Sequence, residues 1–438
     1  MVYAEAVDYI DRLKSERHIA LGLDDLREVL GLLGDPQQGP GFVHIAGTNG
    51  KGSVAAFVSQ ILIEAGYRVG QFTSPAVFEY REIIRVNGTP ICEKDLAACV
   101  ARVRDANERL LATGHAGASA FETETAAAFL YFKDKGCDIV VLETGMGGAD
   151  DATNIVENTL CSVITTVSLD HMKYLGDTAA DIARVKAGII KPGRPVLLGS
   201  APEEARRVIE EVCSKNGSKL LSTDLAALDV KEEGLCGARF DYGRYKDLKI
   251  CAAGHFQPAN ACTAVEVIEI LNDLGYYIED EAVRAGLWNA RIPGRFELIS
   301  RDPAVIIDGA HNPEAAAMLR KSTHLVLKGR RVIYIMGVLK DKDYRSVIRE
   351  TAGAAERIFT VTPDNHRALD GAALAQAIRE EAAAAGFCGT VTACESFYEA
   401  AGKAIIVAGN DAVIIAFGSL SYLSDIKRAI EENINGRR

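Results

Sequence analysis

The chain has 438 residues, more than one hydrophobic core usually serves, so two or three domains are expected. With 48% hydrophobic and 25% charged residues it has the composition of a water-soluble enzyme, and no apolar run approaches the about 18 residues that span a bilayer. A net charge of -11 argues against a nucleic-acid-binding protein, so neither nucleic acid nor membrane is an expected partner.

The N-terminal segment has no apolar core followed by a small-residue cleavage site, so it is not a secretory signal and a cytoplasmic location is expected. Ten cysteines are scattered along the chain without a CxxC pair or the spacing of a zinc site. They are predicted to be reduced thiols, most of them in the core.

Short apolar runs alternate with helical periodicity in the first half of the chain, the pattern of buried parallel strands in an α/β domain. These runs are residues 41–47, 137–145, 160–171 and 194–200. The first run leads into a predicted helix whose apolar positions are Val54, Phe57, Val58, Ile61, Leu62 and Ala65, with Gly66 where a C-terminal cap belongs.

The pattern becomes shorter and more polar between residues 217 and 254, which indicates either an antiparallel hairpin or another embellishment of the α/β domain. Pro and Gly precede a new strand at 291–299, and a second α/β series follows at 304–312, 331–339, 356–363 and 411–420. We therefore predict an α/β protein in which residues 1–296 form one domain and residues 297–438 a smaller one.

The stretch HIAGTNGKGS, residues 44–53, places Lys51 inside a glycine cluster at a predicted strand-to-helix turn. It fails the strict phosphate-loop pattern, with Ile45 where a glycine is required and Gly52 where Ser or Thr should follow the lysine. The physical requirements are still met, because glycines permit the turn, backbone amides can face phosphate oxygens and Lys51 adds a positive charge. A flexible glycine turn is the alternative.

Polar residues follow the next two strands. Glu143 ends one apolar run, and Asp170 and His171 follow another. Parallel strands bind ligands at their carboxyl edge, where an acid beside a phosphate loop would hold magnesium. A solvated glutamate and a surface histidine are the alternatives.

A series of short motifs then resembles, in order, the signatures of the folylpolyglutamate synthase and dihydrofolate synthase family within the Mur ligase superfamily. The motifs are HIAGTNGKGS (44–53), TSP (73–75), ETGMGGADDATN (143–154), DHMKYLG (170–176), KAGIIKPG (186–193), PGRFE (293–297) and DGAHNP (308–313). The resemblance implies a P-loop-type ATPase domain with a parallel sheet, a smaller Rossmann-like α/β domain after it, and ATP between the two.

The implied activity is an ATP-dependent amide ligase that joins L-glutamate to the carboxylate of a folate or dihydropteroate through an acyl phosphate. Its implied cofactors are ATP and Mg²⁺, and a monomer is expected. The resemblance assigns catalytic roles to Lys51, His171 and Lys186, and magnesium ligands to Ser74, Glu143 and His171. Contacts with ATP are assigned to Asn49, Gly50, Lys51, Gly52, Ser53, Asn260, Arg295, Asp308 and His311.

Some of these residues have simpler explanations. Asn260 could cap a helix, Arg295 could be a linker charge, and Asp308 could close a turn. The resemblance is what favours a functional role for them.

A folate pocket is implied at the segment holding Phe121, Glu122, Thr123 and Glu124. The two glutamates could instead form the polar face of a helix. The chain also departs from the family, with Ile83 where an arginine is common unless Arg81 or Arg85 substitutes, and with Ala149 and Asp150 where Arg and Leu are frequent.

Lys186 has the apolar neighbours Ile182, Val185, Ile189 and Ile190, so its ammonium would be poorly hydrated and its pKa lowered. The resemblance implies that this lysine is carbamylated. The alternative is a lysine whose stem covers the helix while its head reaches water.

Two other functions compete. A cell-wall Mur ligase shares the loop and the chemistry but generally has a further N-terminal domain, and residues 1–40 are too few for one. A nucleotide-dependent switch would bind ATP without forming a bond, and would leave the His171 and Lys186 motifs unexplained. The sequence does not indicate which carboxylate donor is used or how many glutamates are added.

Overall fold

The computed structural model describes residues 1–16, 22–170 and 172–436. This part of the chain forms two compact units, each built around its own sheet. The first contains Met1–Pro75, Tyr80–Leu225 and Asn260–Asn289; the second contains Ala76–Glu79, Ala226–Ala259 and the chain from Ala290 onward. By packing, three stretches before residue 297 thus belong to the second unit: Ala76–Glu79, Ala226–Ala259 and residues 290–296. The division at residue 296 stays a prediction for the domains of the sequence.

The sheet of the first unit has the strand order β4-β3-β2-β5-β1-β6-β7-β8 among the described residues. Its strands are β1 (Gly41–Ala46), β2 (Val69–Phe72), β3 (Ile84–Val86), β4 (Thr89–Pro90), β5 (Ile139–Glu143), β6 (Thr159–Thr166), β7 (Val196–Ser200) and β8 (Leu220–Ser222). All neighbouring pairs from β2 to β8 are parallel, whereas β3 and β4 are antiparallel. The carboxyl ends of β2, β5, β1 and β6 therefore meet at one edge.

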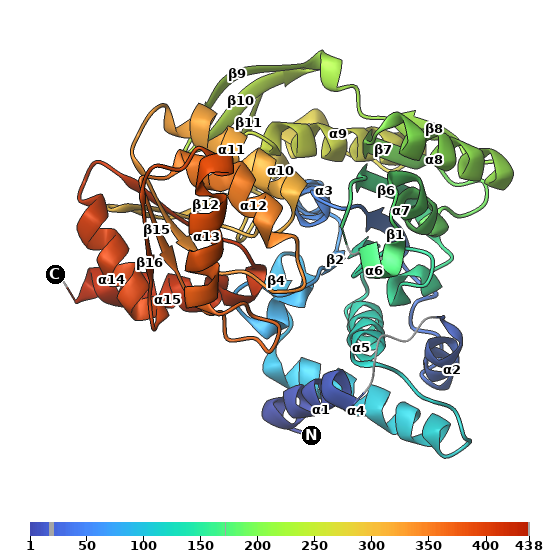
Figure 1. Cartoon of the computed structure of the whole chain (residues 1–438). Helices are drawn as coiled ribbons and strands as arrows, with labels where there is room; N and C mark the ends of the chain where they lie inside the picture. The colour runs from blue at the N-terminus through green and yellow to red at the C-terminus, as the bar shows by residue number, and fades with distance from the viewer. Residues whose placement is uncertain (17–21, 171, 437–438) are drawn as a thin grey trace. The chain divides into compact units, whose positions relative to one another are not determined.

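The helices of this unit pack around the sheet and on one another (Figure 1). They are α1 (Tyr3–Glu16), α2 (Asp24–Leu32), α3 (Lys51–Glu64), α4 (Glu93–Leu111), α5 (Ala120–Asp134), α6 (Met172–Leu175), α7 (Ala179–Lys186), α8 (Glu203–Asn216), most of α9 (Gln257–Asp273) and α10 (Asp280–Asn289). Short 3-10 turns are η1 (Tyr80–Ile83), η2 (Ala152–Ile155) and η3 (Ala187–Ile189).

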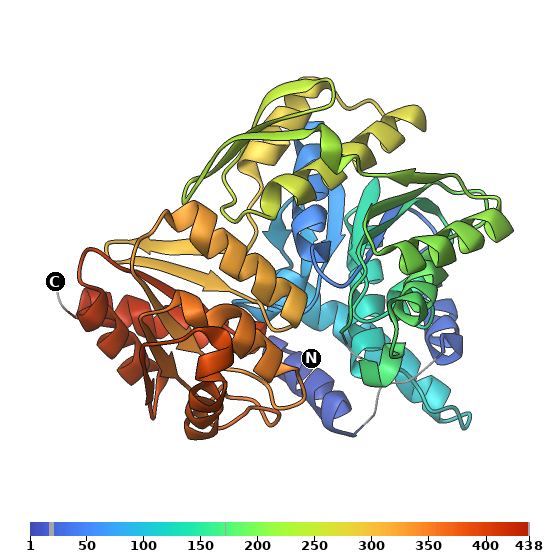
Figure 2. The same cartoon turned by 45° about the horizontal axis from the view of Figure 1, so that its top comes forward.

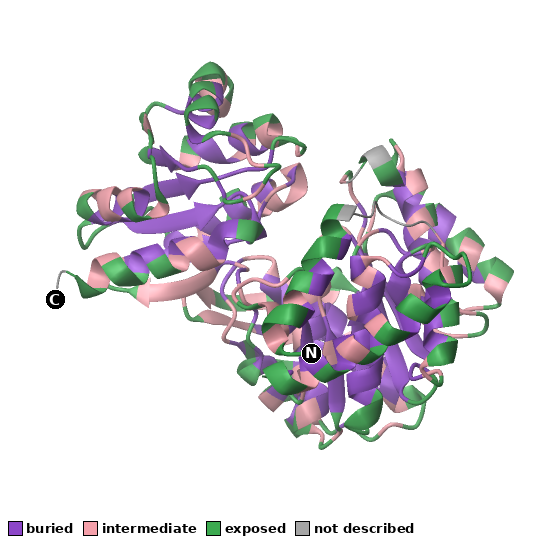
Figure 3. Ribbon diagram, turned by 90° about the horizontal axis from the view of Figure 1, so that it is seen from below, coloured by how far each residue is buried: buried purple, intermediate pink, exposed green. Residues whose placement is uncertain are grey.

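Burial on both faces explains the apolar runs. Every residue of β1 is buried, and on one of its faces the Phe42 ring meets Phe129 of α5 edge-on, with ring centroids 5.8 Å apart. Figure 3 shows the strands at the centre of each unit as buried. A strand covered on both sides must be apolar at successive positions, which is the signal that the sequence carries.

The second unit has a sheet with the order β12-β13-β17-β14-β15-β16 in the described chain. Its elements are β12 (Glu297–Arg301), β13 (Ala304–Asp308), α11 (Pro313–Leu327), β14 (Val332–Met336), α12 (Tyr344–Thr351), η5 (Ala352–Ala354), β15 (Arg357–Thr360), α13 (Gly371–Ala385), β16 (Thr390–Ala393), α14 (Phe397–Ala408), β17 (Val413–Phe417), η6 (Leu420–Tyr422) and α15 (Leu423–Asn435). Of these described strands, β12 alone runs antiparallel to its neighbour.

Helices cover both faces of this sheet. Along β13, Ile306 packs in the cluster that includes α11, α12 and α13, while Val305 and Ile307 pack in the cluster with α14 and α15. This alternation follows from the two-residue period of a strand. The predicted Rossmann-like α/β arrangement is confirmed.

A small antiparallel sheet also belongs to the second unit. It consists of β9 (Leu228–Gly234), β10 (Gly237–Tyr242) and β11 (Tyr245–Ile250), with η4 (Leu225–Ala227) before it. Figures 1 and 2 show it beside the orange helix α11, which contacts β9. The hairpin predicted between residues 217 and 254 corresponds to β10 and β11, and the added strand β9 was not predicted.

Two further sequence expectations are met, those for the helix after the first strand and for the cysteines. The predicted helix after the first strand is α3, and Gly66 just beyond it has a φ of 88°, a conformation that favours glycine. All ten cysteines are free thiols, most of them buried. In the described ranges no helix combines the length and the hydropathy needed to cross a membrane.

The packing of α10 on α3 gives a stability prediction. A Cβ at Gly286 would lie 2.4 Å from the Ile61 Cα, so Gly286→Ala forces two backbones apart. We expect a loss of about 1–3 kcal/mol in the free energy of unfolding, despite the better helix propensity of alanine.

Gly31→Ala is the matched control, because Gly31 lies in α2 and no atom of the described residues comes within 4 Å of the added methyl. It should gain up to about 1 kcal/mol. Urea denaturation measures both variants, and equal stabilisation by the two would contradict the tight α3–α10 contact.

Candidate active site

The loop between β1 and α3 is fastened to the end of β6. The Thr48 amide donates to the Thr166 carbonyl (2.8 Å), and the Asn49 amide donates to Thr166 Oγ1 (3.0 Å). The Thr165 hydroxyl donates to the Asn49 carbonyl (2.6 Å). The loop is therefore a preformed structure held by hydrogen bonds, and the alternative of a flexible glycine turn is disfavoured.

Two glycines make this loop sterically possible. Gly50 has a φ of 87° and precedes α3 as its N-cap, and a Cβ there would lie 2.8 Å from the Asn260 Oδ1. A Cβ at Gly47 would lie 1.9 Å from the Thr165 Oγ1. The loop backbone and the N-terminus of α3 thus form a cradle with partial positive charge, which suits phosphate oxygens.

Lys51 is the first residue of α3 and is half-buried. Its Nζ donates to the carbonyls of Gly47 (3.1 Å) and Thr48 (3.4 Å), so the ammonium lies over its own loop. The lysine can therefore serve a phosphate bound in the cradle without a change of backbone. Gly52 and Ser53 follow in the first turn of α3, where Ser53 is buried.

Glu143 is the last residue of β5 and is only 4% exposed. Its Oε2 lies 3.6 Å from the position of a Cβ on Gly52, so the carboxylate faces the first turn of α3. Ser74 follows β2, the neighbour of β5, at the same edge of the sheet. His171 lies outside the described residues.

These donors fit a magnesium ion that shares its coordination with phosphate. A carboxylate and a hydroxyl are hard oxygen ligands, and Mg²⁺ is usually held by one or two carboxylates plus substrate phosphates and water. The residues that the structure describes contain no group of three or more His, Cys, Asp or Glu able to hold a metal. Glu143 and Ser74 would supply only part of the coordination of such an ion, and phosphate and water would have to supply the rest.

Lys186 ends α7 and is 3% exposed, so its ammonium group does not reach bulk water. The simpler interpretation, in which the ammonium is solvated, is therefore wrong. Burial lowers the pKa of its ammonium to about 7, with a further lowering from the charge of Lys51. Asp170 and Asp151 act in the opposite direction with smaller effect. A neutral amine is thus accessible at physiological pH.

In the second unit, Asp308 ends β13 and is fully enclosed. Its two oxygens accept from the amides of Phe296 and Ala310, both at 2.7 Å. Burial raises the pKa of this carboxyl, while the charge of Arg295 opposes the rise. Asp308 therefore closes a turn, as the simpler explanation proposed. By accepting from the Phe296 amide it also stabilises the left-handed backbone conformation of Phe296, whose φ is 51°.

Arg295 and His311 lie near Asp308 in the same unit. The Arg295 guanidinium reaches within 2.5 Å of the position of a Cβ on Gly309, and the His311 ring Nδ1 pairs with the Gly309 carbonyl at 2.8 Å. If Nδ1 carries the proton, Nε2 is the acceptor. Arg295 also acts electrostatically on Asp308, so it is more than a linker charge.

Asn260 lies inside the first turn of α9 and not before it, so the interpretation as a helix cap is wrong. It belongs to the first unit and contacts the loop glycine Gly50, as described above. Of the predicted ATP contacts, then, the structure groups Asn49 to Ser53 with Asn260 in one unit, and Arg295, Asp308 and His311 in the other.

The predicted folate segment forms the start of α5. Glu122 is the partner of Ser119 in a capping box, and Thr123 is fully buried. Glu124 accepts from the Tyr80 hydroxyl (2.7 Å) and lies 3.8 Å from the Lys14 Nζ. The alternative that both glutamates form a solvated helix face is wrong, because Glu122 is buried and the Glu124 side chain is 11% exposed.

Phe121, in contrast, faces the functional edge. Its ring lies 2.6 Å from the position of a Cβ on Gly145, two residues beyond Glu143. At the position of the family's arginine, Ile83 is buried. The Arg85 Nε donates to the Glu82 carbonyl at 3.0 Å, and Arg81 donates to the Ile91 carbonyl at 3.5 Å.

Sequence reasoning missed the hydroxyl residues that hold the site. Thr48, Thr165 and Thr166 fix the phosphate loop, and the buried Thr153 joins His44 to Asp151. The threonine pair at the end of the third apolar run was visible in the sequence. Its role depends on a pairing between β1 and β6 that a single sequence does not give.

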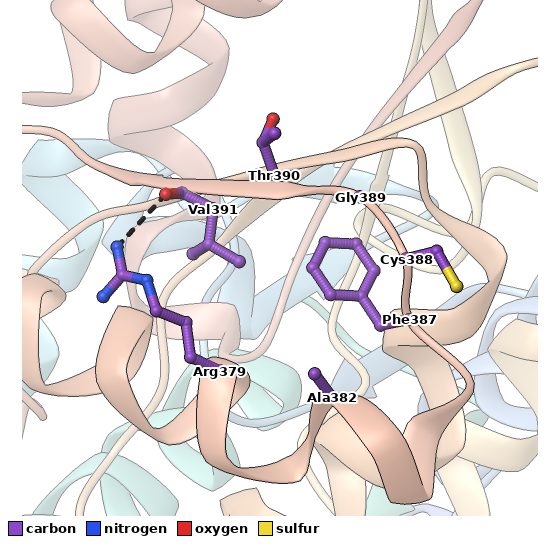
Figure 4. Close-up of a pocket in the computed structure, with 7 residues that line it drawn as sticks. All are labelled: Arg379, Ala382, Phe387, Cys388, Gly389, Thr390 and Val391. Carbon is purple, nitrogen blue, oxygen red and sulfur yellow. Dashed lines mark hydrogen bonds between the residues drawn. The ribbon is translucent and has the colours of Figure 1, made fainter.

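A surface pocket in the second unit is separate from these residues (Figure 4). Its lining consists of Arg379, Ala382, Phe387, Cys388, Gly389, Thr390 and Val391, and Arg379 donates to the Val391 carbonyl at 3.2 Å. The predicted site residues that the structure describes lie elsewhere in the chain, and none of them lines this pocket.

Family models match both halves of the chain. The Mur ligase middle domain matches residues 45–268, and the Mur ligase glutamate ligase domain matches residues 294–420. The chain is 35% identical to a dihydrofolate synthase/folylpolyglutamate synthase of Bacillus subtilis over 421 residues, 94% of this chain and 95% of the relative. The chain belongs to the folylpolyglutamate and dihydrofolate synthase family of Mur ligases. It is an ATP-dependent amide-forming ligase.

Solved structures agree in fold. A folylpolyglutamate synthase from Thermotoga maritima has a TM-score of 0.84 and 34% identity, covering 98% of this chain and 96% of its own. A bifunctional folylpolyglutamate synthase/dihydrofolate synthase from Yersinia pestis, complexed with AMPPNP and a Mn ion, has a TM-score of 0.84 and 29% identity, covering 98% of both chains. Family membership favours glutamate ligation over the cell-wall ligase and the non-ligating switch.

The buried Lys186 predicts a pH dependence of stability. The folded state loses this proton near pH 7, whereas the unfolded state keeps it up to the ordinary lysine pKa of 10.5. Between these values the unfolded state binds more protons, so raising the pH stabilises the folded state, by up to about 1.4 kcal/mol per pH unit.

The variant Lys186→Met lacks this titration. In buffer freed of carbon dioxide, the stability of the wild type relative to Lys186→Met should therefore rise as the pH increases above 7. Denaturant unfolding at several pH values measures the difference. A difference independent of pH would show that Lys186 is hydrated in the folded protein.

Proposed function

We propose that this chain joins the amino group of L-glutamate to the free carboxylate of a folate or a dihydropteroate, converting ATP to ADP and phosphate. The observation that carries the proposal is the gathering of a rigid phosphate cradle, Lys51, the buried Glu143 and the buried Lys186 in one unit. The Bacillus subtilis relative, similar over nearly its whole length, is named for both activities.

The reaction needs ATP because a carboxylate is a poor acylating agent. Transfer of the terminal phosphoryl group of ATP to a carboxylate oxygen gives an acyl phosphate and ADP. The glutamate amine then attacks the acyl carbon, loses a proton, and releases phosphate as an amide forms. The protein must bring anionic groups together, so positioning and charge stabilisation are its main tasks.

The first unit would bind the triphosphate. Backbone amides of Gly50 to Ser53 at the N-terminus of α3 would face the phosphate oxygens, and Lys51 would offset the negative charge as it moves between oxygens. Asn260, which lies next to Gly50, would contact the nucleotide from the same side of the loop. Magnesium held by Ser74, Glu143 and His171 would supply further positive charge against the repulsion between the two anions.

The second unit would hold the rest of the nucleotide. Both Asp308 oxygens already accept backbone amides, so this carboxylate offers only its remaining lone pairs, for example to a hydroxyl group. Arg295 and His311 lie beside it and would bind the nucleotide by charge and hydrogen bonding. Asp308 would thus both shape the loop that holds Arg295 and contact the ligand.

Lys186 would act as a carbamate. A neutral amine adds to the carbon of carbon dioxide and loses a proton, which gives a carboxylate-like anion. Burial of Lys186 and its lowered pKa favour the neutral amine that this addition requires. The carbamate would orient His171 or help to hold a second magnesium ion.

The carboxylate donor would bind near the start of α5. Phe121 is the residue best placed to contact a flat ring, because it packs against Gly145 close to Glu143. Glu122, Thr123 and Glu124 would support this surface from within α5. We further propose that the enzyme acts as a cytoplasmic monomer.

The proposal is tested by release of ADP and phosphate from purified protein. Release should depend on L-glutamate and on either dihydropteroate or a reduced folate, supplied one at a time. Lys51→Ala should lower turnover by about two orders of magnitude or more, because it removes a charge that stabilises the transition state. Its free energy of unfolding should change by less than about 1 kcal/mol, as at other sites outside the core.

Lys135→Ala is the control, since Lys135 pairs with Asp95 at the surface at 2.8 Å. It should retain wild-type turnover. Near wild-type turnover of Lys51→Ala would refute the phosphate-loop proposal, and ADP formation independent of any acceptor would favour the switch.

The carbamate is tested with Lys186→Ala. This variant should lose ligation, and a short carboxylate such as acetate should restore part of it by occupying the vacated space. Lys186→Arg keeps the positive charge and should not be rescued. An unimpaired Lys186→Ala enzyme would remove Lys186 from the site, whereas loss without rescue would argue for a plain lysine.

A further inference from the structure

A chain of hydrogen bonds crosses the interior of the first unit below the functional edge. His44 of β1 pairs through Nε2 with the Thr153 Oγ1 at 2.8 Å, and the Thr153 hydroxyl donates to the Asp151 Oδ1 at 2.5 Å. His44 and Thr153 are 0% exposed and Asp151 is 7% exposed. The proposed reaction mechanism uses none of these three side chains.

The hydrogen-bond partners define the direction of the chain. The Thr153 hydroxyl has one proton and donates it to Asp151, so it must accept from His44, which places the proton of the imidazole on Nε2. Burial lowers the pKa of His44 to about 3, so the ring is neutral. The other ring nitrogen, Nδ1, is buried and has no hydrogen-bond partner in the part of the chain that the structure describes.

Asp151 closes the segment that follows Glu143. Its Oδ2 accepts from the Met146 amide at 2.8 Å, and its Oδ1 accepts from the Thr153 amide at 3.0 Å. One carboxylate therefore ties both ends of the segment 146–153. Thr153 in turn holds that carboxylate in place from below.

The closed segment lies directly on the end of α7. A Cβ at Gly148 would lie 2.7 Å from the Val185 carbonyl oxygen and 2.8 Å from the Lys186 carbonyl oxygen. The Ala149 amide donates to the Val185 carbonyl at 2.9 Å. A Cβ at Gly188 would lie 2.4 Å from the Ala149 Cα, so backbone meets backbone on both sides of Lys186.

A second tie secures the far end of the segment. The Asn154 Nδ2 donates to the carbonyls of Ala149 (2.9 Å) and Gly188 (3.1 Å), and the Lys191 Nζ donates to the Asn154 carbonyl (2.9 Å). These hydrogen bonds join the segment to the end of α7 and to η3, on either side of Lys186.

We infer that Thr153 is a positioning residue, which, with His44, fixes Asp151 and so holds the segment 146–153 against α7 beside the buried Lys186. The importance of this inference for catalysis rests on the proposed role of Lys186. The positioning of the segment does not rest on that role, because the environment of Lys186 can be measured without substrates.

Packing alone does not account for this arrangement. Apolar side chains of similar volume at His44 and Thr153 would fill the same space without leaving a buried nitrogen unsatisfied, which is costly. Hydrogen bonds are directional, so the chain from His44 through Thr153 can orient the Asp151 carboxylate, whereas apolar contacts cannot. Burying the imidazole costs free energy, and the orientation of Asp151 is what the protein gains from it.

The test is the reactivity of Lys186, measured by trace acetylation of the folded protein across a range of pH and quantified by mass spectrometry. Thr153→Val keeps the shape of the side chain and removes its hydroxyl. It should loosen the segment, admit water to Lys186, and raise the apparent pKa of this lysine by about one unit, which lowers its neutral fraction at pH 7 about fivefold. Thr153→Ser keeps the hydroxyl and should behave as the wild type.

Thr351→Val is the matched control. It removes another buried threonine hydroxyl, one that bonds the Val347 carbonyl within α12 of the second unit at 2.7 Å. It should leave the labelling of Lys186 unchanged. His44→Leu, which breaks only the outer link, should change Lys186 in the same direction as Thr153→Val by a smaller factor.

An unchanged Lys186 profile in folded Thr153→Val would overturn the inference, and His44→Leu decides if Thr153→Val does not fold. Failure of both to fold, while Thr351→Val folds, would also overturn it in favour of a role in core formation alone. In ligation assays Thr153→Val should lower kcat and leave the KM for ATP unchanged. A shifted Lys186 profile with unchanged kcat would preserve the positioning and reject the proposed role of Lys186.

Discussion

The convergence of positive charge at one edge of the first sheet is the constraint on which the site depends. The N-terminus of α3, the loop amides and Lys51 all present positive charge there, and the charge of Lys51 acts on Lys186. A second full ammonium in a dry environment beside the first would be costly. The arrangement therefore favours a bound anion and a neutral Lys186, while the charges of Asp170 and Asp151 act in the opposite direction on Lys186.

Close backbone contact is the means by which the site is built. Gly47, Gly50, Gly148 and Gly188 each leave space that a neighbouring atom fills within 2.8 Å of where a Cβ would lie. Such contacts allow threonine hydroxyls and carboxylates to reach main-chain groups directly. The geometry is consequently held by short hydrogen bonds to the backbone, and not by long flexible side chains.

The sequence alone allowed the central sheets, the position of the glycine loop before α3 and the position of Glu143 at a strand end to be predicted. Buried parallel strands are apolar throughout and end in polar residues at a common edge. The strands β2, β8 and β16 escaped prediction because they have only 4, 3 and 4 residues, and β8 and β16 are not fully buried. The packing of Ala226–Ala259 with the second unit escaped for a different reason. It depends on the contact between β9 and α11, which are distant in sequence.

Glutamates of α5 illustrate why site chemistry is harder to predict than site location. Residue type and spacing made Glu122 and Glu124 equal candidates for substrate contact or for a solvated face. The fold instead uses Glu122 to cap its own helix, and buries Glu124 between Tyr80 and Lys14. Both roles require a partner that only the tertiary structure supplies.

The same reasoning separates Lys186 from Lys51, although both are lysines of one site. Lys51 keeps part of its surface exposed and lies over carbonyl groups, so it remains a cation suited to phosphate. Lys186 is buried, and the backbone of the segment 146–153 packs against its main chain, so desolvation has the largest influence on its protonation state. The different chemistry of two identical side chains thus comes from their different burial, and the segment beside Lys186 is the one that we infer Asp151, Thr153 and His44 hold in place.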